Sequence, residues 1–353
     1  MLGKKRKERE AAFREALESG RRSIERGAFE EAILSLERAA DCREYDFEAR
    51  YHLAFACGEA GRFEEAIRHY DLALARNPES ARAYLNRGIA KRRSGKLREA
   101  IEDHTASVEL APRLPEARLY RGFARALRGE HALAVEDFSE AIRLGAEEER
   151  ALRLRARSYE ALDEHAAAAE DYTRLLDIDD RDARAFFGRG VARFYMERYA
   201  EAIADFRAAL EIAPGFRRAE NNLGCALDAC GEYAAAEEAF ARALEESEEE
   251  ESEEARRTRS AFARFNRGFT RFRMKQFEEA LTDFDAAIEF DENDGAFRCA
   301  RGLALRRLGN EEEATEAFRA SVRLGFAPAG GYLKSAERRA ERRRAREAKQ
   351  SGG

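Results

Sequence analysis

Small and large apolar residues return along most of this chain with a period of 34 residues. The clearest series is alanine at nine positions, with one slip of ten extra residues before the eighth: Ala32, Ala66, Ala100, Ala134, Ala168, Ala202, Ala236, Ala280 and Ala314. A fixed period of this size indicates a stack of supersecondary units, because a single unit cannot bury its apolar face alone. The pattern therefore predicts a repeat array, whose function must lie on its surface.

Each unit carries two apolar seams with helical spacing. A small residue stands twelve positions before the alanine, and a larger, mostly aromatic residue stands four positions after it, as Gly122 and Phe138 do around Ala134. Glycine often separates the seams, where it can end the first helix in the left-handed conformation, and proline stands at three matching unit ends. Each unit is therefore predicted to be a helical hairpin.

These residues in this register resemble the tetratricopeptide repeat, a 34-residue helix–turn–helix unit. The resemblance runs from about Phe13 to Pro328 and divides the chain into nine repeats: 13–46, 47–80, 81–114, 115–148, 149–182, 183–216, 217–250, 261–294 and 295–328. Two stretches, "YLNRGIAKRRSGKLREAIEDH" from Tyr84 and "RFNRGFTRFRMKQFEEALTDF" from Arg264, look like the subclass with an Asn-Arg-Gly box. The resemblance implies an all-α fold, a right-handed superhelical solenoid of antiparallel helix pairs.

Segments outside the repeats complete the expected domain organisation. Residues 1–12 form a basic N-terminal arm, 251–260 an acidic insertion that also contains arginine, and 329–353 a capping helix with a basic tail, while 13–250 and 261–328 hold the repeats. A capping helix is expected because the last repeat would otherwise expose its seam. Eight of the ten residues from Glu245 to Glu254 are Glu. This run is interpreted as solvated helix or disorder, or alternatively as a hinge.

Composition narrows the function classes. The net charge of −6 is built from 64 basic and 70 acidic residues of mixed order, so the whole chain does not resemble a nucleic-acid-binding protein. No apolar stretch is long enough for a membrane span, and the five cysteines form no CxxC, which favours a reducing, cytoplasmic location. Scattered histidines and the lack of a phosphate loop or nucleophile motif predict no metal, no cofactor and no enzymatic activity.

A ladder of arginine and aspartate runs through the repeats. Arginine precedes the small residue in six of them, and in five an aspartate follows the alanine by three positions: Arg87 and Asp103, Arg121 and Asp137, Arg155 and Asp171, Arg189 and Asp205, Arg267 and Asp283. Three repeats lack both members, and only Arg301 has no aspartate at the expected position. This covariation predicts structural ion pairs between the two helices of a repeat. The alternative is an anion-binding ladder.

The resemblance implies a concave groove lined by the first helices. Asn86, Asn222 and Asn266 fall on that face, where an amide can both donate to and accept from a peptide backbone, unless it only satisfies neighbouring side chains. Aromatic residues share these helices and are candidate anchors: Tyr51, Phe55, Tyr120, Phe123, Phe187, Phe194, Phe262, Phe265, Phe269 and Phe272. The alternative is that they belong to the core. The residues flanking Asn86 and Asn266 do not form the clamp that some family members use for chaperone tails.

These features predict a non-enzymatic scaffold or adaptor that holds a peptide or helix of a partner protein in the groove. The alternative is an RNA- or nucleoprotein-associated adaptor that acts through the basic segments Lys4–Arg9 and Arg338–Lys349. The chain is expected to be a monomer, with self-association through an uncapped aromatic end as a further hypothesis.

Overall fold

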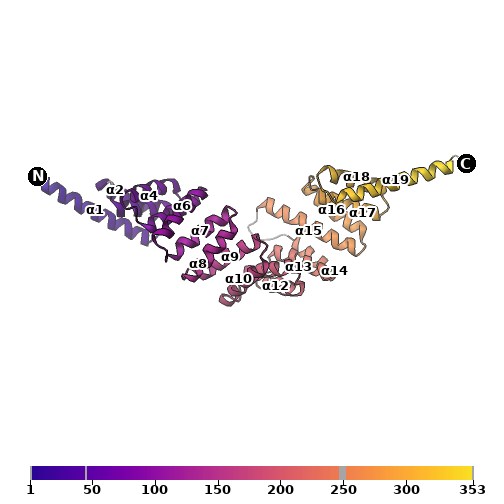
Figure 1. Cartoon of the computed structure of the whole chain (residues 1–353), viewed down its shortest axis with the longest axis horizontal. Helices are drawn as coiled ribbons and strands as arrows, with labels where there is room; N and C mark the ends of the chain where they lie inside the picture. Colours follow the sequence, from indigo (N-terminus) through magenta and orange to yellow (C-terminus); the bar gives the residue numbers. More distant parts are fainter. Residues whose placement is uncertain (1, 44–45, 246–251, 352–353) are drawn as a thin grey trace. The chain divides into compact units, whose positions relative to one another are not determined.

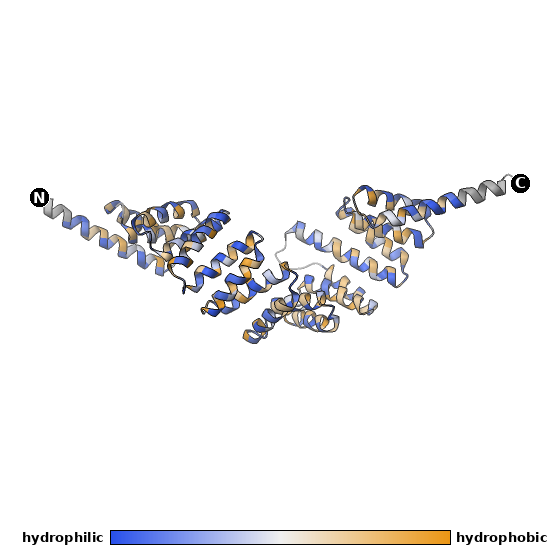
Figure 2. Ribbon diagram, in the orientation of Figure 1, coloured by the Kyte–Doolittle hydropathy of each residue, from blue (hydrophilic) through white to orange (hydrophobic). Residues whose placement is uncertain are grey.

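The computed structural model describes residues 2–43, 46–245 and 252–351, with their side chains except at 2–6, 255 and 343–351 (Figure 1). Over these residues it contains nineteen α-helices and no β-strand. The predicted all-α fold is thereby confirmed. Figure 2 shows hydrophilic and hydrophobic residues in alternating stripes along the helices, as expected when each helix buries one side.

The chain divides into two compact units, Met1–Ile178 and Asp179–Gly353. Unit 1 contains α1 (Leu2–Glu25), α2 (Phe29–Cys42), α3 (Phe47–Glu59), α4 (Phe63–Arg76), α5 (Ala81–Arg93), α6 (Leu97–Leu110), α7 (Pro115–Leu127), α8 (His131–Arg143), α9 (Glu148–Ala161) and α10 (His165–Ile178). Unit 2 contains α11 (Ala183–Tyr195), α12 (Tyr199–Ile212), α13 (Arg217–Ala229), α14 (Tyr233–Ala243), α15 (Glu253–Arg273), α16 (Phe277–Phe290), α17 (Gly295–Arg307), α18 (Glu311–Arg323) and α19 (Ala329–Ser351).

The first eighteen helices pack in consecutive pairs, which we number as hairpins one (α1–α2) to nine (α17–α18). Helices two apart also touch where both are first helices of their hairpins: α1, α3, α5, α7 and α9 in unit 1, and α11, α13, α15 and α17 in unit 2. First helices therefore lie side by side along one face of each unit. This is the face on which the sequence places the groove residues.

Close packing inside a hairpin depends on the small-residue seam. In the fourth hairpin, Ala134 and Phe138 are fully buried, and a Cβ added to Gly122 would lie 2.9 Å from Cε1 of Phe138. Glycine at this position lets the aromatic ring of the second helix lie directly against the backbone of the first. A buried aromatic ring of this kind removes a large apolar area from water.

Every hairpin turn uses one residue in the left-handed conformation. Glycine takes it in six hairpins, for example Gly129 with a φ of 81°, but Asp163, Glu197 and Lys275 take it in the fifth, sixth and eighth with φ between 58° and 66°. A side chain at positive φ costs free energy that glycine avoids. The turn geometry is therefore kept even where the glycine signal is missing from the sequence.

Helix α19 covers the end of the ninth hairpin, as predicted. Ala329 and Ala336 are buried against it, and the ring of Tyr332 stacks on Phe318 with centroids 5.6 Å apart. At the other end, residues 2–12 of the predicted arm belong to the same continuous helix α1 as the first repeat.

The ten-residue slip is accommodated mainly by a longer helix. Helix α15 has 21 residues, whereas α13 and α17 have 13 each, so residues 253–260 of the predicted insertion form its first turns. Residues 246–251 of the Glu-rich run lie outside the described residues, and the hinge at this junction stays a prediction.

Candidate partner-binding grooves

The five Arg–Asp pairs that the covariation indicates are all in contact. Their closest guanidinium-to-carboxylate distances lie between 2.6 and 2.8 Å, and the aspartates are almost completely buried. In the fourth hairpin, Nε and Nη2 of Arg121 both donate to the carboxylate of Asp137. Such bidentate hydrogen bonds compensate for part of the free energy that is needed to remove both charges from water.

Two further kinds of contact add to these Arg–Asp pairs beyond what the sequence spacing indicated, and we call the resulting set of charged residues in a hairpin its ionic seam. In four of the five hairpins a second cation, one turn after the arginine, reaches the same aspartate at 2.6–3.0 Å: Lys91, Arg125, Arg193 and Arg271. The arginine also reaches back to the second helix of the preceding hairpin, as Arg155 does to Oγ of Ser139 at 2.9 Å and Arg87 to Asp71 at 2.6 Å. In these two hairpins the arginine therefore links neighbouring hairpins as well as the two helices of one hairpin.

This backward contact corrects the expectation for Arg301. Its Nε lies 2.6 Å from Oδ1 of Asp285, which stands sixteen residues earlier on the preceding hairpin. The residue is therefore paired, although not within its own repeat. A comparison limited to positions inside one repeat does not detect a partner in the preceding one.

The face of unit 1 that the first helices form contains a pocket of about 280 Å³ between α3, α5 and α7. It brings together three of the predicted groove residues, Phe55, Asn86 and Tyr120. Leu85, Ile89 and Ala90 add apolar lining that the sequence analysis did not single out, and Glu59, Arg93 and Glu116 add charge at the same site.

Neighbouring groups hold the polar side chains of this pocket. Asn86 donates from Nδ2 to the hydroxyl of Tyr51 at 3.0 Å, and burial raises the pKa of that hydroxyl, so Tyr51 stays neutral. The hydroxyl of Tyr120 accepts from Nη1 of Arg150 at 3.2 Å, while the guanidinium lies 4.9 Å from the ring centroid. Asn86 and Tyr120 are thus held in fixed orientations by neighbouring side chains.

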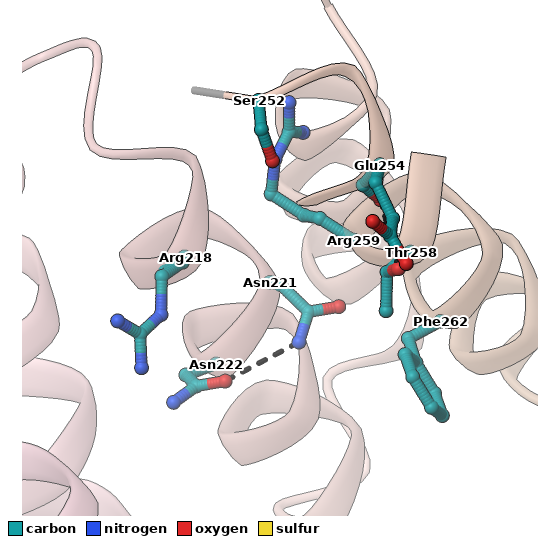
Figure 3. A pocket seen from close by; sticks show the side chains of 8 residues that line it. All are labelled: Arg218, Asn221, Asn222, Ser252, Glu254, Thr258, Arg259 and Phe262. Carbon is teal, nitrogen blue, oxygen red and sulfur yellow. Dashed lines mark hydrogen bonds between the residues drawn. The ribbon is translucent and has the colours of Figure 1, made fainter. Parts of the chain in front are cut away.

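Unit 2 contains a larger and more polar pocket of about 700 Å³ between α13 and α15 (Figure 3). Of the predicted residues it contains Asn222 and Phe262, whose side chain is about half exposed. Ser252 and Glu254 line the pocket too, and Arg218 and Asn221 on α13, with Thr258 and Arg259 on α15, add polar lining that was not singled out from the sequence. Their signal was their position within one turn of Asn222 or Phe262.

The asparagines of unit 2 bond to one another. Nδ2 of Asn221 donates to Oδ1 of Asn222 at 3.2 Å (Figure 3), and Nδ2 of Asn266 donates to Oδ1 of Asn221 at 3.2 Å. Asn266 therefore acts as a support behind the pocket, and it also lies 3.5 Å from Sγ of Cys225. Burial raises the pKa of the Cys225 thiol to about 12, which keeps it protonated and unreactive near neutral pH.

Several predicted aromatic anchors pack mainly against the protein itself. Phe265, Phe269 and Phe272 contact a buried cluster around Phe284, and the rings of Phe269 and Phe284 are 5.3 Å apart. Phe187 and Phe194 pack in the same way on the core formed by α12, α13 and α14, and Phe123 lies beneath the guanidinium of Arg92 at 4.6 Å. All six are half-buried, so each contributes to the core and keeps one edge exposed.

The histidines do not form a site. Among the residues that the structure describes, no group of three or more His, Cys, Asp or Glu side chains is arranged to hold a metal ion. His104 takes the place of the buried aromatic residue in the third hairpin, and neither ring nitrogen has a hydrogen-bond partner there. Burial lowers the pKa of His104 to about 3, so its ring is neutral.

The basic N-terminal segment is partly engaged with its own hairpin. Arg9 donates to the backbone carbonyl of Asp41 at 3.1 Å, while Glu10 forms an ion pair with Arg43. Within the described part of the chain, no helix is both long and apolar enough to cross a membrane.

Family models of the tetratricopeptide repeat match most of the chain. One model matches residues 17–81, 53–115, 85–149 and 265–329, which is more than half of the sequence, and two others match 183–216 and 219–250. The chain therefore belongs to the tetratricopeptide repeat family. These ranges leave out the fifth hairpin, although its helices α9 and α10 are present. Membership of this family supports a role as a protein-interaction scaffold.

Solved structures with the same fold include several bacterial repeat proteins. A tetratricopeptide repeat protein of Parabacteroides merdae is 20% identical, with 73% of this chain and 98% of that chain covered and a TM-score of 0.53. The C-terminal part of a repeat-containing protein of Cytophaga hutchinsonii is 15% identical, covering 65% and 94%, with a TM-score of 0.55. The pilF protein of Pseudomonas aeruginosa is 20% identical, with 59% of this chain and 94% of that chain covered and a TM-score of 0.50. A search of curated proteins gave no significant match. At these identities the likeness shows the fold alone.

Proposed function

We propose that this protein is a non-enzymatic scaffold that holds a peptide or helix of a partner protein along its first helices, with an anchor side chain in the unit 1 pocket. The observation that carries the proposal is the meeting of Phe55, Asn86 and Tyr120, from three successive first helices, around one cavity. Pockets that join several repeats suit an extended ligand, because neighbouring repeats then read neighbouring positions of it.

The chemistry of the unit 1 pocket favours a large apolar anchor. Its volume of about 280 Å³ lies just below the range of about 300–1,000 Å³ that pockets for whole small-molecule ligands have, so it suits one side chain rather than a complete ligand. Phe55, Leu85 and Ile89 supply the apolar walls. Binding energy at protein interfaces is concentrated in such buried anchors.

The polar pocket of unit 2 suits a different part of a ligand. Asn221, Asn222 and Thr258 offer amide and hydroxyl groups that can pair with a peptide backbone, and Arg218 adds a positive charge. We include these residues in the proposed interface as backbone-reading groups. The Asn-Arg-Gly-box subclass and the count of nine tetratricopeptide repeats also belong to this proposal, and nine helical hairpins support that count.

A peptide-display library panned against the full chain tests the proposal. We expect selected peptides to share one large apolar residue and to bind through the unit 1 pocket. Phe55 is half-buried and lines the pocket, so Phe55→Ala should lower the affinity of a selected peptide about tenfold or more, measured by fluorescence anisotropy.

The matched control truncates an apolar residue away from the groove. Leu34 is 61% exposed on α2, a second helix, and Leu34→Ala should leave the affinity unchanged. If the library yields no peptide with an apolar requirement, or if Phe55→Ala binds as tightly as Leu34→Ala, the unit 1 pocket is not the anchor site.

A further inference from the structure

A second pocket of unit 2, of about 470 Å³, lies between the end of α14, the first half of α15 and the end of α16, and it shares Arg259 with the polar pocket. Among the residues that the structure describes, four arginines line it, Arg256, Arg257, Arg259 and Arg264, and two glutamates do so, Glu245 and Glu289. The formal charge of these described lining residues is therefore +2, four positive charges less two negative ones. A cavity with this excess of guanidinium groups is suited to anions.

The four arginines are not equally engaged. The guanidinium of Arg257 lies 5.6 Å from the ring centroid of Phe290, and Arg259 donates to the backbone carbonyl of Ala243. Arg256 and Arg264 form no ion pair with any described residue, unlike the seam arginines of most other hairpins. Of the two acids, Glu245 lies 3.6 Å from Arg217, which is outside the lining.

The ten-residue slip creates this pocket. In the 34-residue register, Gly295 at the start of α17 corresponds to Ala261, so residues 253–260 are an extension of α15 that other first helices of unit 2 lack. Three of the four arginines lie on that extension. Arg256, Ser260 and Arg264 follow one another at one-turn intervals, with the arginines about 12 Å apart along the helix, so both can reach toward a ligand over Ser260.

We propose that this arginine pocket binds a phosphate group, held by Arg256 and Arg264 and belonging either to a small phosphate compound or to a phosphorylated side chain. A phosphate monoester carries about −1.5 to −2 charges at neutral pH, which matches the formal charge of the lining better than one carboxylate does. Guanidinium groups bind its oxygens in pairs, with bonds stronger than those between neutral groups. This site is separate from the unit 1 pocket, and its test does not depend on peptide binding in that pocket.

Isothermal titration calorimetry on the full chain tests the site with two probes. One is inorganic pyrophosphate, and the other is a short peptide containing phosphoserine, compared with the same peptide containing serine. We expect wild-type protein to bind at least one phosphorylated probe, and Arg256→Gln with Arg264→Gln to weaken that binding about tenfold or more. Binding of pyrophosphate alone assigns the site to small phosphate compounds, whereas discrimination between the two peptides assigns it to a modified side chain.

A matched double variant separates a specific site from general electrostatics. Arg338 and Arg342 are exposed on α19, so Arg338→Gln with Arg342→Gln removes the same charge elsewhere and should change the affinity less than about twofold. Glu289→Gln should strengthen binding, because it removes an acid from the lining, and a misfolded variant cannot give that result. Absence of binding by the wild type, or equal losses in the two double variants, would overturn the proposal.

Discussion

The fourth and seventh hairpins share one backbone arrangement but fill it with opposite chemistry. In the fourth, Arg121, Arg125 and Asp137 form a buried ionic cluster beside Gly122 and Phe138. In the seventh, the corresponding residues are Leu223, Leu227 and Ala239, and each is at most 3% exposed. The small residue and the aromatic ring are kept in both, as Gly224 and Phe240.

The comparison shows that the close contact between glycine and the aromatic ring is the common requirement of the two hairpins, and the ion pair is one of two ways to fill the space beside it. An apolar seam avoids the desolvation of charges, whereas an ionic seam needs every member to be paired. Nη1 of Arg121 also reaches Oγ1 of Thr105 on the preceding hairpin at 3.5 Å, which a leucine cannot do by hydrogen bonding. Stability should therefore depend on the whole set of three residues rather than on any one of them.

Removal of the shared aspartate should have the largest effect. Asp137→Ala leaves both Arg121 and Arg125 without their common partner in a seam where Asp137 is only 2% exposed. We expect a loss of about 3–5 kcal/mol in the free energy of unfolding of unit 1, measured by urea denaturation followed by circular dichroism.

The matched control replaces all three ionic residues of the fourth hairpin by the residues at the corresponding positions of the seventh. Arg121→Leu, Arg125→Leu and Asp137→Ala together reproduce Leu223, Leu227 and Ala239, and this triple variant should stay within about 1 kcal/mol of the wild type. A triple variant as unstable as Asp137→Ala alone would show that the two seams are not interchangeable.

A single arginine should matter less than the aspartate. Arg121→Leu leaves Asp137 paired with Arg125, whose Nη1 lies 2.7 Å from Oδ2, so we expect a loss of only about 2 kcal/mol by the same measurement. A loss equal to that of Asp137→Ala would mean that the second cation does not compensate. In that case the seam would act as a simple pair.

The smallest effect concerns the third hairpin, which keeps the ionic seam but has His104 instead of phenylalanine. The pKa of His104 in the folded state, about 3, is below its value in the unfolded chain, near 6.5. Between these two pH values the unfolded chain binds more protons than the folded one, so the free energy of unfolding falls as the pH is lowered through this range. His104→Phe should remove about 1 kcal/mol of the stability difference between about pH 6.5 and about pH 5.5. Urea titrations of both proteins at the two pH values measure it, and parallel profiles would contradict the buried neutral histidine.

Much of the fold was predictable because the period of 34 residues repeats a local pattern. The paired helices, their seams and the capping helix follow from residue size at helical spacing, and the Arg–Asp contacts follow from their joint absence in three repeats. The candidate site was predicted only in part. Phe55, Asn86 and Tyr120 do line one pocket, but Phe265 and Phe269 pack against Phe284, and an aromatic stripe at helical spacing does not reveal how far its helix is rotated.

The sequence by itself determined the repeat, the hairpin and the side chains that must pack closely, because these depend on spacing along a helix and on side-chain volume. Tertiary structure decided which cation from the next helical turn reaches Asp137 and which residue of the preceding hairpin holds Arg301. It also decided that the extended α15 forms an arginine pocket. These contacts join residues whose distance depends on how helices cross, and that geometry is set by the packing of whole hairpins.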